Sequence, residues 1–127
     1  MEVIKIKATH DKPGVILDKK NNKFEFKGNS LPENANSFYE PILKWFDEYI
    51  KNPNPRTVIE LKLDYLNTAS SKAFFSIFMK IEKIKETGND VLIKWYYDED
   101  DEDMEEVGEE FDDIINLPFE HISYEGD

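Results

Sequence analysis

Residues 61–85 read LKLDYLNTASSKAFFSIFMKIEKIK and contain the change of pattern that decides the fold. Together with residues 57–60, the first part of this stretch carries apolar side chains at every second position, which is the spacing of a strand that buries one face. The alternating positions are Ile59, Leu61, Leu63 and Tyr65. This half of the stretch therefore predicts a buried strand.

The second half of the stretch has the spacing of an amphipathic helix from Ala73 to about Lys85. Its apolar stripe consists of Phe74, Ile77, Phe78 and Ile81, and Phe75, Met79 and Ile84 are expected to widen it. A strand followed directly by a helix is the first part of a βαβ unit, in which the helix covers one face of the sheet.

Polar side chains fill the interval between the two patterns, at residues 67–72. Asn67, Thr68, Ser70 and Ser71 are all able to cap free backbone N–H groups, so a helix is expected to begin here. The free N–H groups and aligned peptide dipoles of a first helical turn favour negative charge, so a phosphorylated hydroxyl would be well tolerated. A purely structural capping role explains the same residues, because such loops usually carry Ser, Thr, Asn or Asp.

The rest of the chain predicts a single α/β (α+β) domain spanning residues 1–127. Three short antiparallel strands are expected first, the third of them ending at Gly28 and Asn29. A helix is expected next, beginning with the capping-box spacing of Ser37 and Glu40. After the central strand and second helix come a further strand at 91–97, a third helix at about 103–116 and an edge strand at 119–124. The order predicts a mixed sheet with N-terminal antiparallel strands, βαβ units and about three helices.

The charge of the chain is concentrated in one segment. The formal net charge is −12, and 12 of the 28 acidic residues lie between Asp98 and Asp113, where there is no Lys or Arg. The remaining 16 acidic residues balance the 16 basic ones. Such a field disfavours nucleic acid and anionic lipid and favours a partner with a basic face.

Other features of the composition bear on the compartment. The chain contains no cysteine, and its first residues alternate between apolar and charged, unlike a signal peptide. No apolar run approaches the length of a membrane span. We therefore expect a cytoplasmic protein that does not bind membranes.

The sequence offers little support for a metal site. His10 and His121 are far apart, and the acidic run resembles a calcium loop in spacing but has Asp103 where such a loop needs glycine. The residues at calcium-loop spacing are Asp98, Asp100, Glu102 and Glu109. We expect no metal and no cofactor.

Catalytic motifs are also missing from the sequence. There is no Gly-rich phosphate loop, nucleophile elbow or zinc-protease pair. A small enzyme that uses Asp64, Tyr65 and Lys72 in a pocket is an alternative, but these residues form no recognised catalytic pairing. We expect no enzymatic activity and assign no catalytic residue.

The chain resembles the SiaC family of bacterial regulatory phosphoproteins over nearly its full length. The most specific likeness is the segment from Asp64 to Lys72, which contains Asn-Thr-Ala-Ser-Ser-Lys. Further matching segments are Phe38 to Ile42, Trp95 to Tyr97, Asp98 to Glu110, and Leu117 to Phe119. The resemblance implies a STAS-like fold, similar to anti-sigma-factor antagonists, and a role in partner switching.

The resemblance also implies a set of partners and a modified residue. A Ser/Thr protein kinase would phosphorylate Thr68, and a PP2C-type phosphatase would remove the phosphate. The unmodified protein would bind and activate a diguanylate cyclase that controls biofilm formation or aggregation. The residues expected to contact partners are Tyr65, Asn67, Ser70, Ser71 and Lys72, and the free protein is expected to be a monomer. The alternative is a constitutive acidic adaptor that binds a basic partner whether or not it is phosphorylated.

Overall fold

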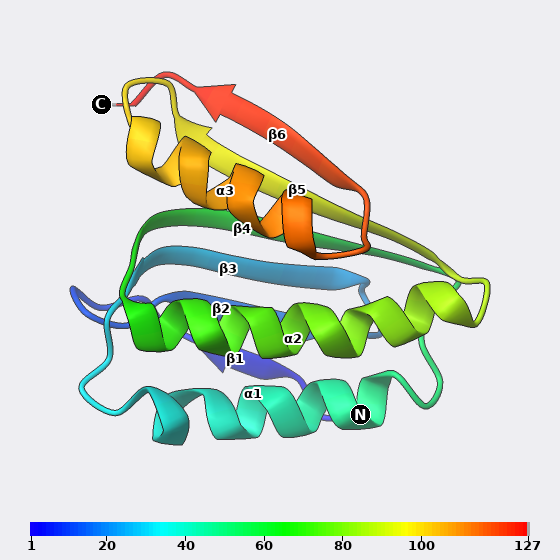
Figure 1. Ribbon diagram of the computed structural model, residues 1–127. Helices are drawn as coiled ribbons and strands as arrows, with labels where there is room; N and C mark the ends of the chain where they lie inside the picture. Colours follow the sequence, from blue (N-terminus) through cyan, green and yellow to red (C-terminus); the bar gives the residue numbers. More distant parts are fainter. Residues whose placement is uncertain (127) are drawn as a thin grey trace.

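The computed structural model of the chain describes residues 1–126 and shows one sheet with three helices on one face (Figure 1). The strands are β1 (Ile4–Ile6), β2 (Gly14–Asp18), β3 (Lys23–Ser30), β4 (Arg56–Leu66), β5 (Asp90–Asp98) and β6 (Phe119–Tyr124). The helices are α1 (Ala35–Tyr49), α2 (Thr68–Glu86) and α3 (Glu102–Ile114).

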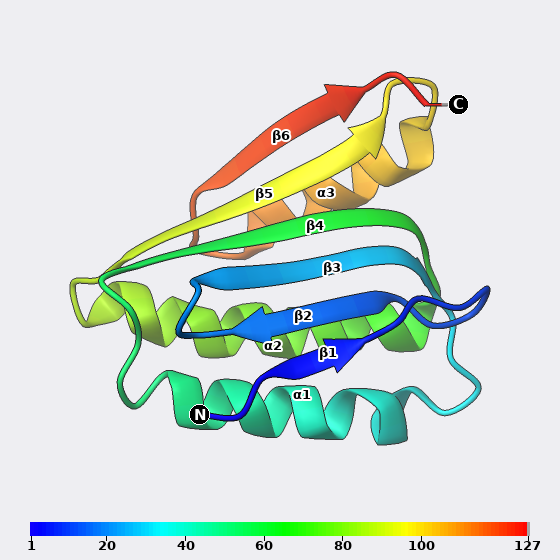
Figure 2. The same cartoon turned by 180° about the vertical axis from the view of Figure 1, so that it is seen from behind.

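The six strands lie in the sheet in the order of the sequence, from β1 to β6. The first three are antiparallel, whereas β3, β4, β5 and β6 are parallel and are joined by the three helices as crossovers. Seen from behind, the sheet lies in front of all three helices (Figure 2). The predicted mixed α/β sheet is therefore confirmed, including its N-terminal antiparallel strands.

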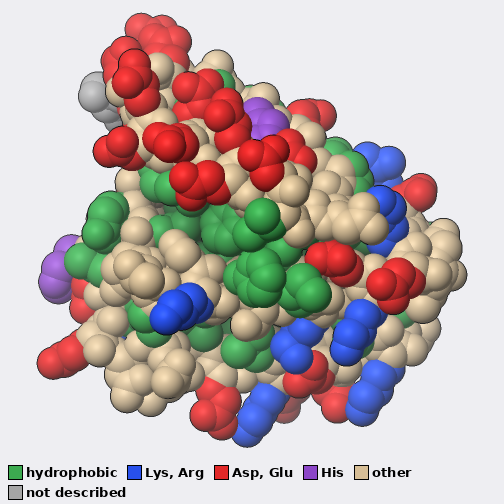
Figure 3. Space-filling model, viewed as in Figure 1, with side chains coloured by type: hydrophobic (Ala, Val, Ile, Leu, Met, Phe, Trp, Pro, Cys, Tyr) green, Lys and Arg blue, Asp and Glu red, His purple; other side chains and the backbone are tan. Residues whose placement is uncertain are grey.

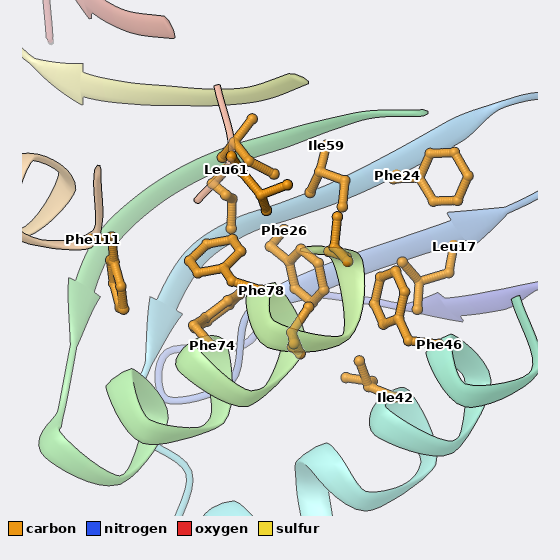
Figure 4. Close-up of a cluster of buried hydrophobic side chains, with 14 of the residues drawn as sticks. Leu17, Phe24, Phe26, Ile42, Phe46, Ile59, Leu61, Phe74, Phe78 and Phe111 are labelled. Atoms are coloured by element: carbon orange, nitrogen blue, oxygen red, sulfur yellow. The ribbon is translucent and has the colours of Figure 1, made fainter. Parts of the chain in front are cut away.

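The core lies between the sheet and the helices and is rich in aromatic rings (Figure 4). Phe26 of β3 packs edge-on against Phe74 of α2, with ring centroids 5.0 Å apart. Tyr49 of α1 packs against Phe24 of β3, with ring centroids 5.1 Å apart. Edge-on and offset contacts of this kind add to the stabilisation from buried apolar area, so α1 and α2 are fixed firmly on the sheet.

Helix α3 lies close against β5 because of a glycine. A Cβ atom on Gly108 would be 2.5 Å from the ring of Trp95, a distance that requires one of the two to move. The Trp95 indole N–H also donates to the carbonyl of Met104, at 3.0 Å. The acidic helix is therefore a folded part of the domain, as its apolar spacing predicted.

Two predicted boundaries were wrong. Helix α1 begins at Ala35 and not at Ser37, because the side chain of Asn34 accepts from the Ser37 N–H and caps the helix. Strand β3 continues to Ser30 past the expected stop at Gly28, which lies at a register shift with φ +106°. Glycine allows the chain to bend at this point and still pair with β4.

Three apolar side chains expected in the core lie on the surface. Tyr65 is 50% exposed, Phe75 40% and Met79 45%. Tyr65 follows the last buried position of β4, Leu63, as the strand runs past the covered part of the sheet. Phe75 and Met79 lie on the side of α2 that points away from the sheet, so the buried stripe of this helix is narrower than predicted.

Candidate functional site

The N-terminus of α2 is held by a cap and by the neighbouring strand. The side-chain oxygen of Asn67 accepts from the Ser70 N–H at 2.8 Å, and the Asn67 carbonyl accepts from the Ser71 N–H at 3.0 Å. The Asn67 N–H donates to the carbonyl of Ser30 at 3.0 Å, which ties the end of β4 to the end of β3. The helix consequently begins at Thr68, inside the polar segment 67–72 in which its start was expected.

A buried chain of hydroxyl groups lies beneath this first turn. The hydroxyl of Ser30 donates to the Ser70 hydroxyl at 2.7 Å and lies 2.5 Å from the Tyr39 hydroxyl. Because Ser30 donates its only hydroxyl proton to Ser70, the Tyr39 hydroxyl donates to Ser30. Burial raises the pKa of Tyr39 to about 12. The network joins α1, β3 and α2 with neutral groups and stays protonated near neutral pH.

Thr68 lies on the opposite, solvent side of the same turn. It is the first helical residue, and its side chain is exposed. Neither its N–H nor that of Ala69 donates a hydrogen bond to an acceptor in residues 1–126. Free N–H groups and the positive end of the helix dipole therefore surround an accessible hydroxyl, which is a favourable position for an added anion.

The other residues expected to contact partners have different positions. Tyr65 and Lys72 are exposed, Asn67 and Ser71 are partly buried, and Ser70 is fully buried. Lys72 is one turn after Thr68 on the same side of the helix, and among residues 1–126 it forms no salt bridge.

Ser70, which was expected to contact a partner, is buried in this structure. Its hydroxyl belongs to the buried network beneath the turn, so it stabilises the position of α2 and offers nothing to the surface. The sequence could not separate Ser70 from Thr68, since both are hydroxyl residues that can cap a helix.

An open groove between α1 and α2 begins at Thr68. It has a volume of about 720 Å³, and α2 contributes Thr68, Ala69, Lys72, Ala73 and Ser76 to its wall. The facing wall consists of Ala35, Asn36, Tyr39, Glu40, Leu43 and Lys44 of α1. Sequence reasoning missed these α1 residues, because only the packing of the two helices brings them opposite Thr68.

Two further candidate sites have ordinary structural explanations. The carboxylate of Asp98 accepts from the Asp100 N–H at 2.9 Å, and that of Asp101 accepts from the Met104 N–H at 3.1 Å and caps α3. Asp112 pairs with His121 at 2.8 Å, which joins α3 to β6. Among residues 1–126, no three His, Asp or Glu side chains are grouped so that they could hold a metal ion. No helix in that part of the chain is long and apolar enough to cross a membrane.

The sequence model of one family, described as SiaC family regulatory phosphoprotein, matches residues 6–124. The chain belongs to the SiaC family. A relative from Pseudomonas aeruginosa (strain UCBPP-PA14) is 29% identical over 119 residues, which are 94% of each chain. Most of the domain described above is therefore shared with this relative.

Solved structures of SiaC from Pseudomonas aeruginosa have the same fold. One matches with a TM-score of 0.88 and 27% identity, over 98% of this chain and 100% of the other. A second is SiaC in a complex with the diguanylate cyclase SiaD, which it activates; the TM-score is 0.89 at 27% identity, over 95% of this chain and 99% of the other. The fold of this SiaC family member is thus one that binds a protein partner in a relative.

Proposed function

We propose that this SiaC family protein is a partner-switching regulator controlled by phosphorylation of Thr68. A Ser/Thr kinase adds the phosphate, a PP2C-type phosphatase removes it, and the unmodified form binds and activates a diguanylate cyclase in the cytoplasm. The observation that carries the proposal is the exposure of Thr68 at the first position of α2, beside free N–H groups.

The two neighbouring hydroxyl groups are poorer phosphate acceptors. Ser70 is buried and hydrogen-bonded to Ser30, so a kinase would have to unfold the turn to reach it. Ser71 is partly buried and lines a hollow together with Glu110, whose charge would oppose a phosphate. Thr68 instead shares its side of the helix with Lys72, which can pair with a phosphate.

Phosphorylation changes the surface and leaves the fold unchanged. A phosphate adds about −1.5 to −2 charges at pH 7, and the N–H groups of the first turn accommodate it without rearrangement of α2. A partner that covers Thr68 would have to desolvate this phosphate, which costs several kcal/mol when no cation pairs with it. At about 1.4 kcal/mol per tenfold change in affinity, this cost weakens binding by a factor of about a hundred or more.

The acceptor residue is tested by treating the purified protein with its kinase and ATP and measuring the intact mass. Wild type is expected to gain one phosphate, Thr68→Ser to gain one, and Thr68→Ala to gain none. Ser71→Ala is the matched control and is expected to be labelled like wild type. Labelling that persists in Thr68→Ala, with the phosphate mapped to Ser71, would contradict the assignment.

A second candidate function is a constitutive acidic adaptor, which the acidic surface over α3 favours (Figure 3). Binding of the cyclase to wild type, Thr68→Ala and Thr68→Asp separates the two functions. A switch predicts that Thr68→Asp binds at least about tenfold more weakly than the other two proteins. Equal binding by all three would support the adaptor.

A further inference from the structure

Strand β4 contains one extra residue just before the turn that leads into α2. Gly28 of β3 pairs with Leu63, whereas the next residue of β3 pairs with Tyr65. Asp64 lies between Leu63 and Tyr65 and forms a bulge in β4. A bulge turns a strand and redirects the side chains that follow it, and bulges are common beside functional sites. Leu66 consequently packs against the core and Tyr65 is exposed as the chain enters α2.

The turn after the bulge is held from the inside by three buried side chains. Ser30, Tyr39 and Ser70 are each at most 1% exposed, and they belong to β3, α1 and α2 respectively. The Ser30 hydroxyl lies 2.7 Å from that of Ser70 and 2.5 Å from that of Tyr39. The backbone carbonyl of Ser30 also accepts from the Asn67 N–H, at 3.0 Å. Ser30 therefore holds the chain at two points, one before and one after Thr68.

Stability alone does not explain three hydroxyl groups at this place in the core. A buried hydrogen bond adds about 1 kcal/mol net, and replacing both of its partners by apolar groups of the same shape can be neutral. A fully satisfied polar network differs from apolar packing because it makes the arrangement of its members unique and rigid. Each of the three hydroxyl groups here has a partner. The network therefore fixes how α1, β3 and α2 lie relative to one another at the start of α2.

The position of the Thr68 oxygen decides how fast a kinase can modify it. In the transfer, this oxygen forms a bond to the γ-phosphorus of ATP, the bond from that phosphorus to ADP breaks, and the hydroxyl proton passes to a base of the kinase. The attacking and leaving oxygens lie roughly in line, and a displacement of about 1 Å can lower the rate about a hundredfold. Thr68 is the first residue of α2, and helix ends fray when nothing holds them.

We propose that Ser30 and Tyr39 are positioning residues for the phosphorylation of Thr68, because their network fixes the first turn of α2 in the orientation in which the kinase meets the Thr68 hydroxyl. The inference rests on the proposed function. Both residues are buried, so they act through Ser70 and Asn67 and not by contact with the kinase or ATP. Their loss is therefore expected to lower kcat and to leave KM nearly unchanged, since the surface that the kinase binds stays the same.

Tyr49 provides a matched control on the same helix. Its side chain is also fully buried, and its hydroxyl lies 2.7 Å from that of Thr57 and accepts from the Asn54 N–H at 3.1 Å. Tyr49 is ten residues after Tyr39, which is about 15 Å along the helix axis. As the last residue of α1, it lies at the end of the sheet away from the start of α2 (Figure 1). Tyr49→Phe therefore removes a comparable hydroxyl group far from Thr68.

The first experiment measures the rate of phosphate incorporation at Thr68 by the kinase, at saturating ATP and over a range of concentrations of this protein. Tyr39→Phe and Ser30→Ala are each expected to lower kcat at least about tenfold, with KM within about twofold of wild type. The double variant is expected to lose about as much as either single variant, because each change breaks the same network. Tyr49→Phe is expected to keep both constants within about twofold of wild type.

Four kinetic results would overturn the proposal. They are a wild-type kcat in Tyr39→Phe, an equal loss of kcat in Tyr49→Phe, a rise in KM with kcat unchanged, and a double variant whose loss is the product of the two single losses. If Thr68 of wild type is phosphorylated and Tyr39→Phe is phosphorylated at the same rate, the positioning role fails and the proposed function stands. If Thr68 of wild type takes up no phosphate, the proposed function fails and this inference fails with it.

The second experiment measures amide hydrogen exchange by NMR, without the kinase. The N–H groups of Asn67, Ser70 and Ser71 are expected to exchange at least about tenfold faster in Tyr39→Phe than in wild type, while those in the second half of α2 keep their rates. Tyr49→Phe is expected to leave the rates of the first turn unchanged. Wild-type exchange in the first turn of Tyr39→Phe would contradict the positioning role independently of the kinetics.

Discussion

The two sides of α2 differ sharply although they carry the same kinds of side chain. On the inner side, Ser70 and Phe74 are fully buried. On the outer side, Thr68 and Phe75 are exposed. Ser70 is only two positions from Thr68, and Phe74 is next to Phe75. The direction in which a side chain leaves the helix, and not the residue type, therefore decides whether it supports the fold or is available to other proteins.

The largest expected effect comes from placing a charge on each side of the first turn. Ser70→Asp puts a carboxylate among the hydroxyl groups of Ser30 and Tyr39, where no cation can pair with it. The cost is several kcal/mol, comparable with the whole stability of about 5–15 kcal/mol of a small domain. Thr68→Asp should change the free energy of unfolding by about 0.5 kcal/mol or less. Urea denaturation followed by circular dichroism gives both free energies of unfolding. Similar values for the two variants would contradict the difference between the buried and the exposed side of α2.

The two adjacent phenylalanines are the next test of the inner and outer sides. Phe74→Ala removes a ring that packs against Phe26 and Tyr39 and should lower the free energy of unfolding by about 3–5 kcal/mol. Phe75→Ala should lower it by about 1 kcal/mol or less, because its ring is already partly in water. Thermal and urea unfolding measure the difference. A loss of more than about 2 kcal/mol in Phe75→Ala would show that this ring supports the core.

Alkaline pH tests the buried hydroxyl network itself. The pKa of Tyr39 is raised to about 12 in the folded protein, from about 10 in the unfolded chain, because burial favours the neutral phenol. Its contribution to stability is complete below pH 10 and is lost as pH rises through 12, by about 2–3 kcal/mol in all. Tyr39→Phe should therefore show a shallower loss of stability over this range than wild type.

The control for this pH series is Tyr65→Phe, since Tyr65 is on the exposed side of the site. Its unfolding free energy should fall with pH as steeply as that of wild type between pH 10 and 12. A wild-type slope in Tyr39→Phe would show that the Tyr39 phenol does not contribute to the alkaline loss of stability.

The smallest expected effect comes from removing the side chain of Asn67, which caps the first turn of α2. Asn67→Ala removes the side-chain acceptor of the Ser70 N–H and should lower the free energy of unfolding by about 1 kcal/mol. Asn36→Ala, an exposed position in the first turn of α1, should change it by about 0.5 kcal/mol or less. If the two variants are equally stable in urea, the cap contributes less to the first turn than its geometry indicates.

Much of the fold could be predicted from local patterns. The alternation from Ile59 to Leu63 and the helical spacing of Phe74 and Phe78 each describe one element, and the structure confirms both. The loop that carries Thr68 was also recognised, because its polar residues lie where one spacing changes to the other. The start of α1 was predicted less accurately, because Ser37 can cap a helix as well as Asn34 can.

The sequence by itself determined the order of strands and helices, the position of the acidic helix α3 and the presence of a hydroxyl-rich turn before α2, because each depends on residues close together in the chain. Only the tertiary structure decided that Ser70 is buried, that Thr68 is exposed, and that Phe75 and Met79 lie on the surface. Those outcomes depend on which side of α2 is covered by Tyr39 of α1 and by Ser30 of β3, residues that are distant in sequence. A helical pattern describes how side chains are arranged around an axis, whereas burial depends on what packs against that axis.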